Sequence, residues 1–379
     1  MGLDGKVLIV GSGIGGLTLA HALRVRGIAH EIFEQARQLS DVGAGLLLHP
    51  GALAALSQLG LRQAVERAGH EILHGLAITS GGAVLQDTSL AALRDDVGAG
   101  TFGIHRARLQ EVLLAGLEEV RLGRRFERYE ADASGVTAHF SDGSSARGAL
   151  LVGADGLRSR VRQQLLGAEP LRYAGYTSWR GVARMENPFG AHELREIWGR
   201  GERFGIVPID EQSTYWFAVA NAPEGERDED ALAEVERRFA NWSEEIRKLL
   251  AASQRERVLR TDIHDRDPVP RWSQGRVTLL GDAAHPMTPN LGQGACMSIE
   301  DSVVLAARLH ESESLDAALA SYERQRFPRT SRMVRSSRQL GQLAQLESPL
   351  LIFLRDLMLR ATPKRVVEKQ LRENARFAP

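Results

Sequence analysis

Cysteine is almost absent from this chain of 379 residues, in which Cys296 is the only one. A single cysteine excludes an internal disulfide framework and a zinc site built from several thiolates, and we expect no metal site. Net charge is absent too, because 48 Lys and Arg residues balance 48 Asp and Glu residues. Without a net basic field, neither nucleic acid nor an anionic membrane is expected as a partner.

The chain also lacks sorting and spanning segments. Its first residues, from Met1 to Lys6, have no cationic segment and no apolar core of a secretory signal, and Lys6 departs from the myristoylation pattern. No uninterrupted apolar run reaches the roughly 20 residues that a membrane-spanning helix requires. We therefore expect a cytoplasmic protein, a monomer or homodimer, without membrane association.

A glycine-rich turn near the N-terminus carries the first functional signal. Its context is, in order, a strand (6–10), the turn GSGIGG (11–16), a helix to about residue 26 and a strand (29–34). Gly11 permits a tight turn, Gly13 lets the backbone approach a pyrophosphate, and Gly16 lets helix and strand pack closely. Glu34 ends the second strand, where a carboxylate would accept hydrogen bonds from a ribose. The unit predicts dinucleotide binding, and it fits NAD and FAD equally.

A second signal lies between residues 276 and 309. The apolar run 277–280 predicts a buried strand, and Gly281-Asp282 places a carboxylate just beyond its end, where ligands gather in open α/β sheets. The turn-forming stretch from Pro289 to Gly294 then opens a helix, which would offer free N–H groups to an electron-rich ligand. An ordinary strand–loop–helix crossover fits the same pattern.

Two further stretches carry candidate polar groups. Residues 150–156 predict a strand that ends at Asp155-Gly156, followed by three arginines (158, 160 and 162) that would neutralise phosphates or form a solvated helix face. A glycine turn at 42–45 precedes a strand in which His49 follows three leucines. His49 is either a satisfied, partly buried histidine or a polar group in a pocket. A helix expected from Ile104 begins with basic residues, which the helix dipole disfavours unless Arg106 faces an anion or solvent.

The chain as a whole predicts an α/β fold, with a Rossmann-like domain interleaved with a β-rich domain. The expected nucleotide-binding domain comprises residues 1–70, 98–172 and 265–335, and the β-rich domain comprises 71–97 and 173–264. Most of the tryptophans fall in the second domain, where aromatic strands form either a core or a wall over a cofactor. The segment 336–379 is expected to be helical and to pack on the body, with a second subunit or a membrane surface as alternatives.

Three motifs in this order and spacing, GSGIGG, GADGLRSRV and LLGDAAHPMTPNLGQGACMSIEDSVVLA, resemble the group A flavin monooxygenases. These are single-component FAD-dependent aromatic hydroxylases of the p-hydroxybenzoate hydroxylase fold, and the likeness spans residues 5 to about 335. The short members that act on urate, salicylate-like acids or alkylquinolones look most similar. The resemblance implies that reduced flavin forms a C4a-hydroperoxide, which hydroxylates an electron-rich aromatic or heteroaromatic ring at the expense of NAD(P)H and O2. An epoxidase of the same fold and a non-oxygenating flavoprotein reductase are the alternatives.

The resemblance also implies roles for particular residues. The expected ligands of non-covalently bound FAD are Gly11, Gly13, Gly15, Gly16, Glu34, Arg37, Arg106, Gln110, Asp155, Asp282, Pro289, Gly292, Gln293 and Gly294. Asp155 would also serve NADH or NADPH, which has no domain of its own here. Arg203 matches an arginine that touches substrate in some members, and His49 is the nearest candidate for a proton acceptor. Leu47 stands where some members have a polar catalytic residue, so their base mechanism does not carry over.

Overall fold

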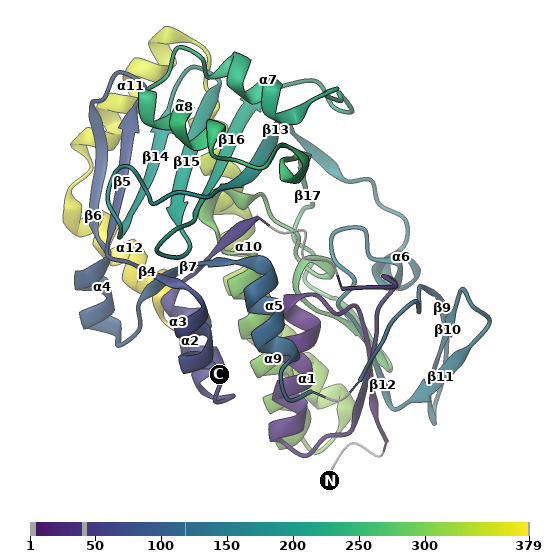
Figure 1. Ribbon diagram of the computed structural model, residues 1–379. Helices are drawn as coiled ribbons and strands as arrows, with labels where there is room; N and C mark the ends of the chain where they lie inside the picture. Colours follow the sequence, from purple (N-terminus) through teal and green to yellow (C-terminus); the bar gives the residue numbers. More distant parts are fainter. Residues whose placement is uncertain (1–4, 40–43, 118, 378–379) are drawn as a thin grey trace.

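The structure is a computed structural model that describes residues 5–39, 44–117 and 119–377 (Figure 1). Met1–Asp4 and the first part of the expected glycine turn, residues 42–43, lie outside the described residues. Two large sheets organise the chain, one in each expected domain, and long helices near the C-terminus run behind both. The α/β fold class expected from the sequence is confirmed.

The first large sheet has six strands, almost all parallel. Their order is β18 (Ser273–Gln274), β19 (Val277–Leu279), β12 (Leu150–Gly153), β1 (Val7–Val10), β2 (His30–Phe33) and β8 (Val120–Arg121), and only β18 runs antiparallel to its neighbour. The strands β1, β12 and β19 are buried throughout. Continuous apolar strands of this kind suit a parallel sheet that is covered on both faces.

Helices and a small sheet cover the two faces of this six-stranded sheet (Figure 1). On one face α1 (Ile14–Val25) packs between α5 (Arg106–Leu114) and α9 (Gly294–Glu311). On the other lies a three-stranded antiparallel sheet of β9 (Phe126–Asp132), β10 (Gly135–Phe140) and β11 (Ser145–Gly148). Strands β10 and β11 form a hairpin, and α6 (Arg160–Leu166) packs against β9.

The second large sheet has seven strands drawn from both segments of the β-rich domain. Their order is β17 (Leu259–Asp265), β13 (Arg172–Ala183), β16 (Thr214–Asn221), β15 (Glu202–Pro208), β14 (Glu193–Trp198), β5 (His74–Thr79) and β6 (Val84–Ser89). Only the β14–β5 pair is parallel. One face is covered by α7 (Ala231–Arg238) and α8 (Glu244–Ala251).

A small sheet joins the two halves of the molecule. It consists of β3 (Gly45–Leu48), β7 (Thr101–His105) and β4 (His70–Ile72), flanked by α2 (Pro50–Ser57), α3 (Arg62–Ala68) and α4 (Leu90–Val97). The helix expected from Ile104 begins only at Arg106, because Ile104 and His105 pair with Leu46 and Gly45 in the sheet. Sheet pairing here overrides the local helical pattern.

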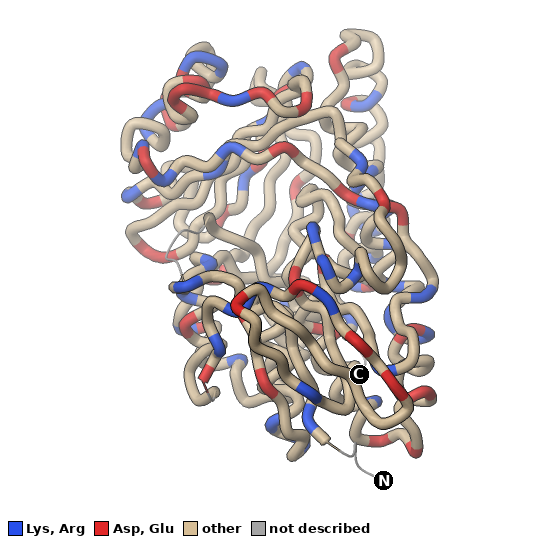
Figure 2. The backbone as a smooth tube through the Cα atoms, turned by 90° about the vertical axis from the view of Figure 1, so that its right-hand side faces the viewer, with Lys and Arg blue, Asp and Glu red and all other residues tan. Residues whose placement is uncertain are grey.

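The C-terminal part is helical, as expected, in α10 (Leu315–Ala344), α11 (Pro349–Ala361) and α12 (Lys364–Ala375). The structure shows no break at residue 336, where the last domain boundary was expected, because α10 continues through it with Pro328 inside the helix. Figure 2 shows basic and acidic residues interleaved along the chain, in keeping with its zero net charge. In the described part of the chain, no helix is long and apolar enough to cross a membrane, and no cluster of side chains suits a metal ion.

Candidate functional site

The expected cofactor residues meet at one edge of the six-stranded sheet. Strands β19, β12, β1 and β2 lie side by side and run in the same direction, so their carboxyl ends share that edge. Following these ends in order, the chain presents Asp282, Asp155, the glycine turn that starts at Gly11, and Glu34. Ligands bind at this edge in open α/β sheets. The topology therefore brings together four signals that are spread over more than two thirds of the sequence.

The glycine turn is shaped by close backbone contacts. Gly11 has a φ of +105°, and a Cβ there would overlap the carbonyl oxygen of Ala154. A Cβ on Gly16 would overlap the carbonyl oxygen of Gly11, while one on Gly15 would lie 2.6 Å from Cδ2 of Leu280. A Cβ on Gly13, in contrast, would meet nothing within 4 Å, so the turn presents bare backbone at this point. Gly11, Gly15 and Gly16 thus close the turn, and Gly13 leaves room for a ligand.

Glu34 fixes the turn from the side of β2. Its Oε2 accepts hydrogen bonds from the Ser12 N–H (2.9 Å) and hydroxyl (3.0 Å), and its Oε1 accepts one from the Ala36 N–H (2.9 Å). Gln110 on α5 reaches the same turn, because its Nε2 donates to the Ser12 carbonyl at 3.4 Å. Arg106 and Arg37 are both exposed, and Arg106 opens α5.

Asp282 lies close to the start of α9. Its side chain is exposed, and the surrounding protein raises its pKa by desolvation, an effect that the charges of His285 and Arg106 partly offset. A Cβ on Gly294, the first residue of α9, would stand 3.8 Å from Oδ1 of Asp282, so the carboxylate faces the positive end of an 18-residue helix.

Asp155 organises the beginning of α6. Its Oδ1 accepts a hydrogen bond from the Ser159 hydroxyl (2.5 Å), and its Oδ2 accepts from the Arg160 N–H (2.8 Å). Burial is the largest cause of its raised pKa, and these hydrogen bonds partly counter it. Arg162 differs from the sequence expectation of a phosphate ligand or a solvated face. It is buried, and its Nη1 donates to the carbonyls of Ala283 and Ala284 at 3.1 and 2.9 Å.

The loop before α9 connects both halves of the molecule. It contains a short 3-10 turn, η3 (Pro289–Leu291), and Gly292, whose φ is +62°. Nδ2 of Asn290 donates to the Tyr176 hydroxyl (2.9 Å) on β13 and to the Ser337 carbonyl (2.7 Å) on α10. A Cβ on Gly341 of α10 would overlap Nδ2 of Asn290. The loop is therefore held against the seven-stranded sheet by specific polar contacts.

Arg203 on β15 takes part in the same contacts. Its side chain is 1% exposed, its Nη1 donates to Oε1 of Glu196 at 3.0 Å, and its Nη2 donates to the amide oxygen of Asn290. The guanidinium also stands 5.9 Å from the centre of the Tyr176 ring. Its Nε is buried and finds no hydrogen-bond acceptor in the described part of the protein. Nη2 holds the loop and Nη1 pairs with strand β14, which leaves the Nε–H as a donor for a bound molecule.

The face of the seven-stranded sheet opposite α7 and α8 supplies an aromatic wall. Alternation along the strands turns Trp179, Phe204 and Trp216 into the core under those helices, and it turns Tyr215 and Phe217 to the other face. There they cluster with residues that include Leu47 of β3, Val182 and Val207. Trp179 and Trp216 therefore belong to the hydrophobic core, and Tyr215 and Phe217 form the wall.

His49 stands between this wall and the loop. Its Nε2 is buried, lacks a hydrogen-bond partner among the described residues and lies 3.4 Å from where a Cβ of Gly292 would be. Desolvation lowers its pKa to about 4, although a backbone hydrogen bond at Leu291 acts in the opposite direction. The imidazole is therefore neutral near pH 7. A base of such low pKa is poorly matched to accepting a phenolic proton at that pH. A hydrogen bond to the substrate is therefore a better role for His49 than the expected role of proton acceptor.

This lowered pKa makes the stability of the protein depend on pH. The unfolded chain binds a proton at His49 below about 6.5, whereas the folded protein does so only below about 4. Because the unfolded chain takes up this proton first, the free energy of unfolding is unaffected by His49 above pH 6.5 and decreases as the pH falls from 6.5 towards 4. When the pH falls from 7 to 5, the free energy of unfolding should decrease in the parent protein by up to about 2 kcal/mol more than in His49→Gln. Partial exposure of His49 makes this value an upper bound. Thermal unfolding measured across this range tests it, with His310→Gln, an exposed histidine, as the control. Identical slopes for the parent and His49→Gln would contradict the assignment.

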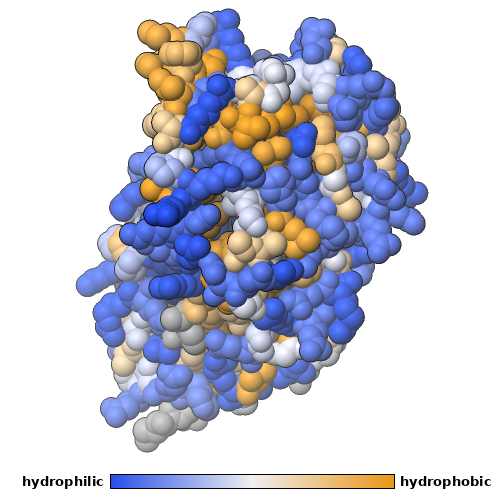
Figure 3. Space-filling view, turned by 90° about the vertical axis from the view of Figure 1, so that its left-hand side faces the viewer, coloured by the Kyte–Doolittle hydropathy of each residue, from blue (hydrophilic) through white to orange (hydrophobic). Residues whose placement is uncertain are grey.

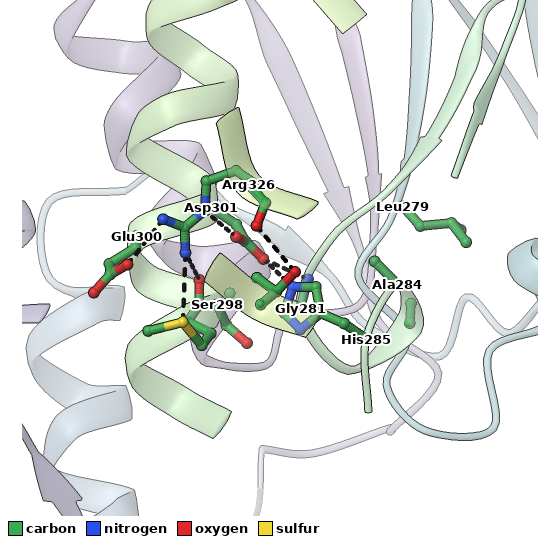
Figure 4. Close-up of polar contacts among 12 residues, drawn as sticks. Leu279, Gly281, Ala284, His285, Ser298, Glu300, Asp301 and Arg326 are labelled. Atoms are coloured by element: carbon green, nitrogen blue, oxygen red, sulfur yellow. Dashed lines mark hydrogen bonds and ion pairs between the residues drawn. The ribbon is translucent and has the colours of Figure 1, made fainter. Parts of the chain in front are cut away.

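A buried cluster of charged side chains supports the cofactor edge from behind (Figure 4). Oδ1 of Asp301 accepts from Nε of Arg326 at 2.6 Å, and Oδ2 contacts Nε2 of His285 at 2.6 Å and accepts from the Gly281 N–H at 3.2 Å. Arg326 also pairs with Glu300 at 2.9 Å. Burial opposes ionisation of Asp301, but the charges of His285 and Arg326 lower its pKa overall. The cluster thus fixes the turn that carries Asp282 to helices α9 and α10.

Sequence reasoning did not find this cluster. The signal was present, because Glu300 and Asp301 interrupt an otherwise apolar stretch of α9, and both are fully buried. Two adjacent carboxylates at a helix position that must be buried predict basic partners elsewhere in the chain. Nothing in the sequence pattern pointed to Arg326, since the interior of α10 carries many arginines.

Comparison with known proteins agrees with the geometry. The chain matches the family described as FAD binding domain over residues 4–337. It is 45% identical over 376 residues to the aurachin C monooxygenase/isomerase of Stigmatella aurantiaca, covering 98% of each chain. It is 37% identical over 342 residues to the FAD-dependent urate hydroxylase of Klebsiella pneumoniae, covering 88% of this chain and 89% of that one. The solved structure of Klebsiella pneumoniae HpxO with FAD and uric acid has a TM-score of 0.91 at 32% identity, covering 98% of this chain and 96% of that chain.

The fold and this edge define an FAD-dependent monooxygenase of the single-component aromatic hydroxylase class. The residues fit FAD, because bare backbone at Gly13, carboxylates at Glu34 and Asp282, and the start of α9 provide the kinds of groups that its diphosphate, ribose and ring require. The chain belongs to the FAD binding domain family. The resemblance found in the sequence is confirmed.

Proposed function

We propose that the protein hydroxylates a planar, electron-rich aromatic or heteroaromatic molecule with O2, taking electrons from NADH or NADPH. The observation that carries this proposal is the meeting of three elements at one place: the loop at Asn290–Gly292, the strand end at Leu47–His49 and the aromatic face at Tyr215 and Phe217. FAD held at the sheet edge supplies the redox chemistry. The protein supplies a site that binds and orients a flat ring and excludes water from it.

Arg203 and His49 are the residues that we assign to the substrate. The unpaired Nε of Arg203 is a donor for a carbonyl, carboxylate or phenolate oxygen, while Nη2 keeps the loop against β15 and Nη1 pairs with Glu196 of β14. The neutral imidazole of His49 offers a second hydrogen bond from the opposite strand. Together they would fix the ring by its polar substituents.

NAD(P)H docks transiently in this proposal, beside Asp155 and the exposed arginines Arg158 and Arg160. The support is that the described residues contain one parallel-sheet unit with a glycine-rich turn, and that unit suits FAD. Arg160 and Arg158 are accessible, whereas Arg162 is not. We also retain the division into an FAD-binding part and a substrate-binding part, with α10 shared between them.

The proposed function is tested by a panel of aromatic acids, purines and quinolones. A true substrate should accelerate NADH or NADPH oxidation and yield a product that carries one 18O atom from labelled O2. An inert compound that only binds should accelerate oxidation with release of hydrogen peroxide and no labelled product. Reduction of an acceptor without O2 consumption would identify a reductase and overturn the proposal.

Arg203 is expected to act in substrate binding and coupling. Arg203→Gln removes the charge and one donor, so we expect KM for the aromatic substrate to rise about 10- to 100-fold, the equivalent of one charge-assisted hydrogen bond. The share of NAD(P)H that ends as product should fall as well, while FAD content stays unchanged. Steady-state kinetics with product quantification measure both effects. Arg247→Gln, at an exposed arginine of α8 on the other face of the sheet, is the control, and equal kinetics for parent and Arg203→Gln would contradict the assignment.

A second reaction outcome is favoured by one comparison. The relative with 45% identity is described as a monooxygenase/isomerase, a name that couples oxygen insertion to a rearrangement. If the present protein shares this outcome, its product has gained one oxygen atom but has an altered ring substitution pattern. NMR of the labelled product distinguishes this from simple hydroxylation.

A further inference from the structure

The helix α11 turns a broad apolar face to the solvent, and a charged residue lies on its inner side. Its side chains that face the protein include Arg355, which is 3% exposed, pairs with Asp356 at 2.8 Å and stacks 5.2 Å from the Trp198 ring centre. Its solvent face carries large apolar residues that are 47–66% exposed, namely Leu350, Leu351, Phe353, Leu354, Leu357 and Met358. Figure 3 shows apolar side chains gathered in this region, at the upper left of the view. We call these six residues the α11 patch.

The α11 patch is wide and uninterrupted. At 100° per residue its six members span an arc of about 160° around the helix, and the sequence places no charged residue within that arc. The inner residues 352, 355, 356 and 359 occupy the opposite side. Soluble proteins seldom expose a contiguous apolar patch of this kind without a partner for it.

Basic residues are concentrated at the C-terminal end of the α11 patch and along α12. Between residues 349 and 377 the chain has seven Lys or Arg against three Asp or Glu, although the whole protein is neutral. Lys364 and Arg372 on α12 are paired with Asp87 and Asp96, at 3.2 and 2.7 Å. Arg360 in the last turn of α11 and Arg365 in the first turn of α12 are exposed, and no carboxylate in the described part of the chain pairs with them.

We propose that the α11 patch docks the protein on an anionic lipid bilayer, with α11 lying in the plane of the interface. An apolar helix face flanked by arginine and lysine matches the acyl boundary and the anionic headgroups of such a surface. The described helices do not span a membrane, so the contact is peripheral. This mode differs from the sequence expectation of a tail that only packs on the body.

A second copy of the chain fits the α11 patch less well. Two paired helices cover a narrow stripe of each other, and an arc of about 160° would leave its flanks exposed. A helix of 13 residues is about 20 Å long, so one face of it falls short of the roughly 800 Å² that each partner contributes to a stable interface. A bilayer surface covers the entire arc at once.

Flotation of the FAD-loaded protein with vesicles tests the proposal. With vesicles of phosphatidylcholine and phosphatidylglycerol (3:1) at low salt, we expect most of the protein to float, and about tenfold less with phosphatidylcholine alone or in 0.5 M NaCl. Leu354→Glu combined with Leu357→Glu should abolish flotation without changing FAD content or the unfolding temperature. Arg360→Gln with Arg365→Gln should reduce the preference for anionic vesicles. Val25→Glu, at an exposed valine on α1, is the matched control and should float like the parent.

Three results would overturn the proposal. The first is a parent protein that stays at the bottom of the gradient with every vesicle composition, and the second is a double glutamate variant that floats as the parent does. The third is a dimer in sedimentation velocity that the double glutamate variant dissociates, without vesicle binding by the parent, which would assign the α11 patch to a second copy of the chain.

Discussion

Arg326→Met is expected to lower the free energy of unfolding by about 3–5 kcal/mol, because it leaves buried carboxylates without their shared counterion. Arg326 contacts Asp301 at 2.6 Å and Glu300 at 2.9 Å, and all three side chains are excluded from solvent. Methionine keeps much of the aliphatic volume, so the loss is chiefly electrostatic. Urea unfolding at saturating FAD measures it.

Two further variants make this result specific. Adding Asp301→Asn to Arg326→Met should recover part of the loss, because it removes a buried carboxylate charge that Arg326 no longer balances, whereas Glu300 still pairs with Arg329 at 2.7 Å. Lys248→Ala removes an exposed ion pair with Glu244 and should leave the unfolding midpoint unchanged. If Arg326→Met unfolds at the same urea concentration as Lys248→Ala, the buried cluster does not stabilise the fold.

Asp282→Ala is expected to weaken FAD binding about 10- to 150-fold, the equivalent of losing one hydrogen bond to a charged group worth about 1.5–3 kcal/mol. The carboxylate lies just beyond the carboxyl end of β19, opposite the first residue of α9. Its removal takes away an acceptor for the sugar-like hydroxyls of the cofactor. Titration of the apoprotein with FAD, followed by flavin fluorescence, gives the dissociation constant.

The control for this measurement is Asp316→Ala, which removes an exposed carboxylate from the first turn of α10. Its affinity for FAD should equal that of the parent. Acid precipitation of the holoprotein should also release the yellow cofactor into the supernatant, as expected for FAD without a covalent bond. An unchanged dissociation constant for Asp282→Ala would remove Asp282 from the FAD site.

The cofactor edge could be predicted from the sequence because parallel strands follow a simple rule. Short apolar runs ending at Gly11, Asp155 and Asp282 each predict a buried strand, and a parallel sheet brings such ends together. The glycines of the first turn have spacing requirements that few other structures share. Local pattern and topology therefore agree in this part of the chain, and the family followed from the same residues.

Contacts between distant segments could not be predicted in this way. The strand β7 was missed because its pairing with β3 lies outside the local pattern, and the continuity of α10 was missed because a change of domain does not require a break in a helix. Arg162 resembled its exposed neighbours Arg158 and Arg160 in sequence, yet it turns inward to backbone carbonyls. Burial of a charged side chain depends on partners that only the folded chain supplies.

The order of the strands has a consequence for how the chain acquires its structure during synthesis. His74 on β5 pairs with Glu193 on β14, and the parallel sheet of the first domain receives β19 only at residues 277–279. β1 and β5 pair early with β2 and β6, but the other edge of each strand must wait for a partner synthesised much later. Pairing across such sequence separations folds slowly and exposes strand edges to aggregation. We expect fragments that end before α9 to need chaperones or to be degraded, and a ribosome-stalled series of lengths would show protease resistance only after this helix has emerged.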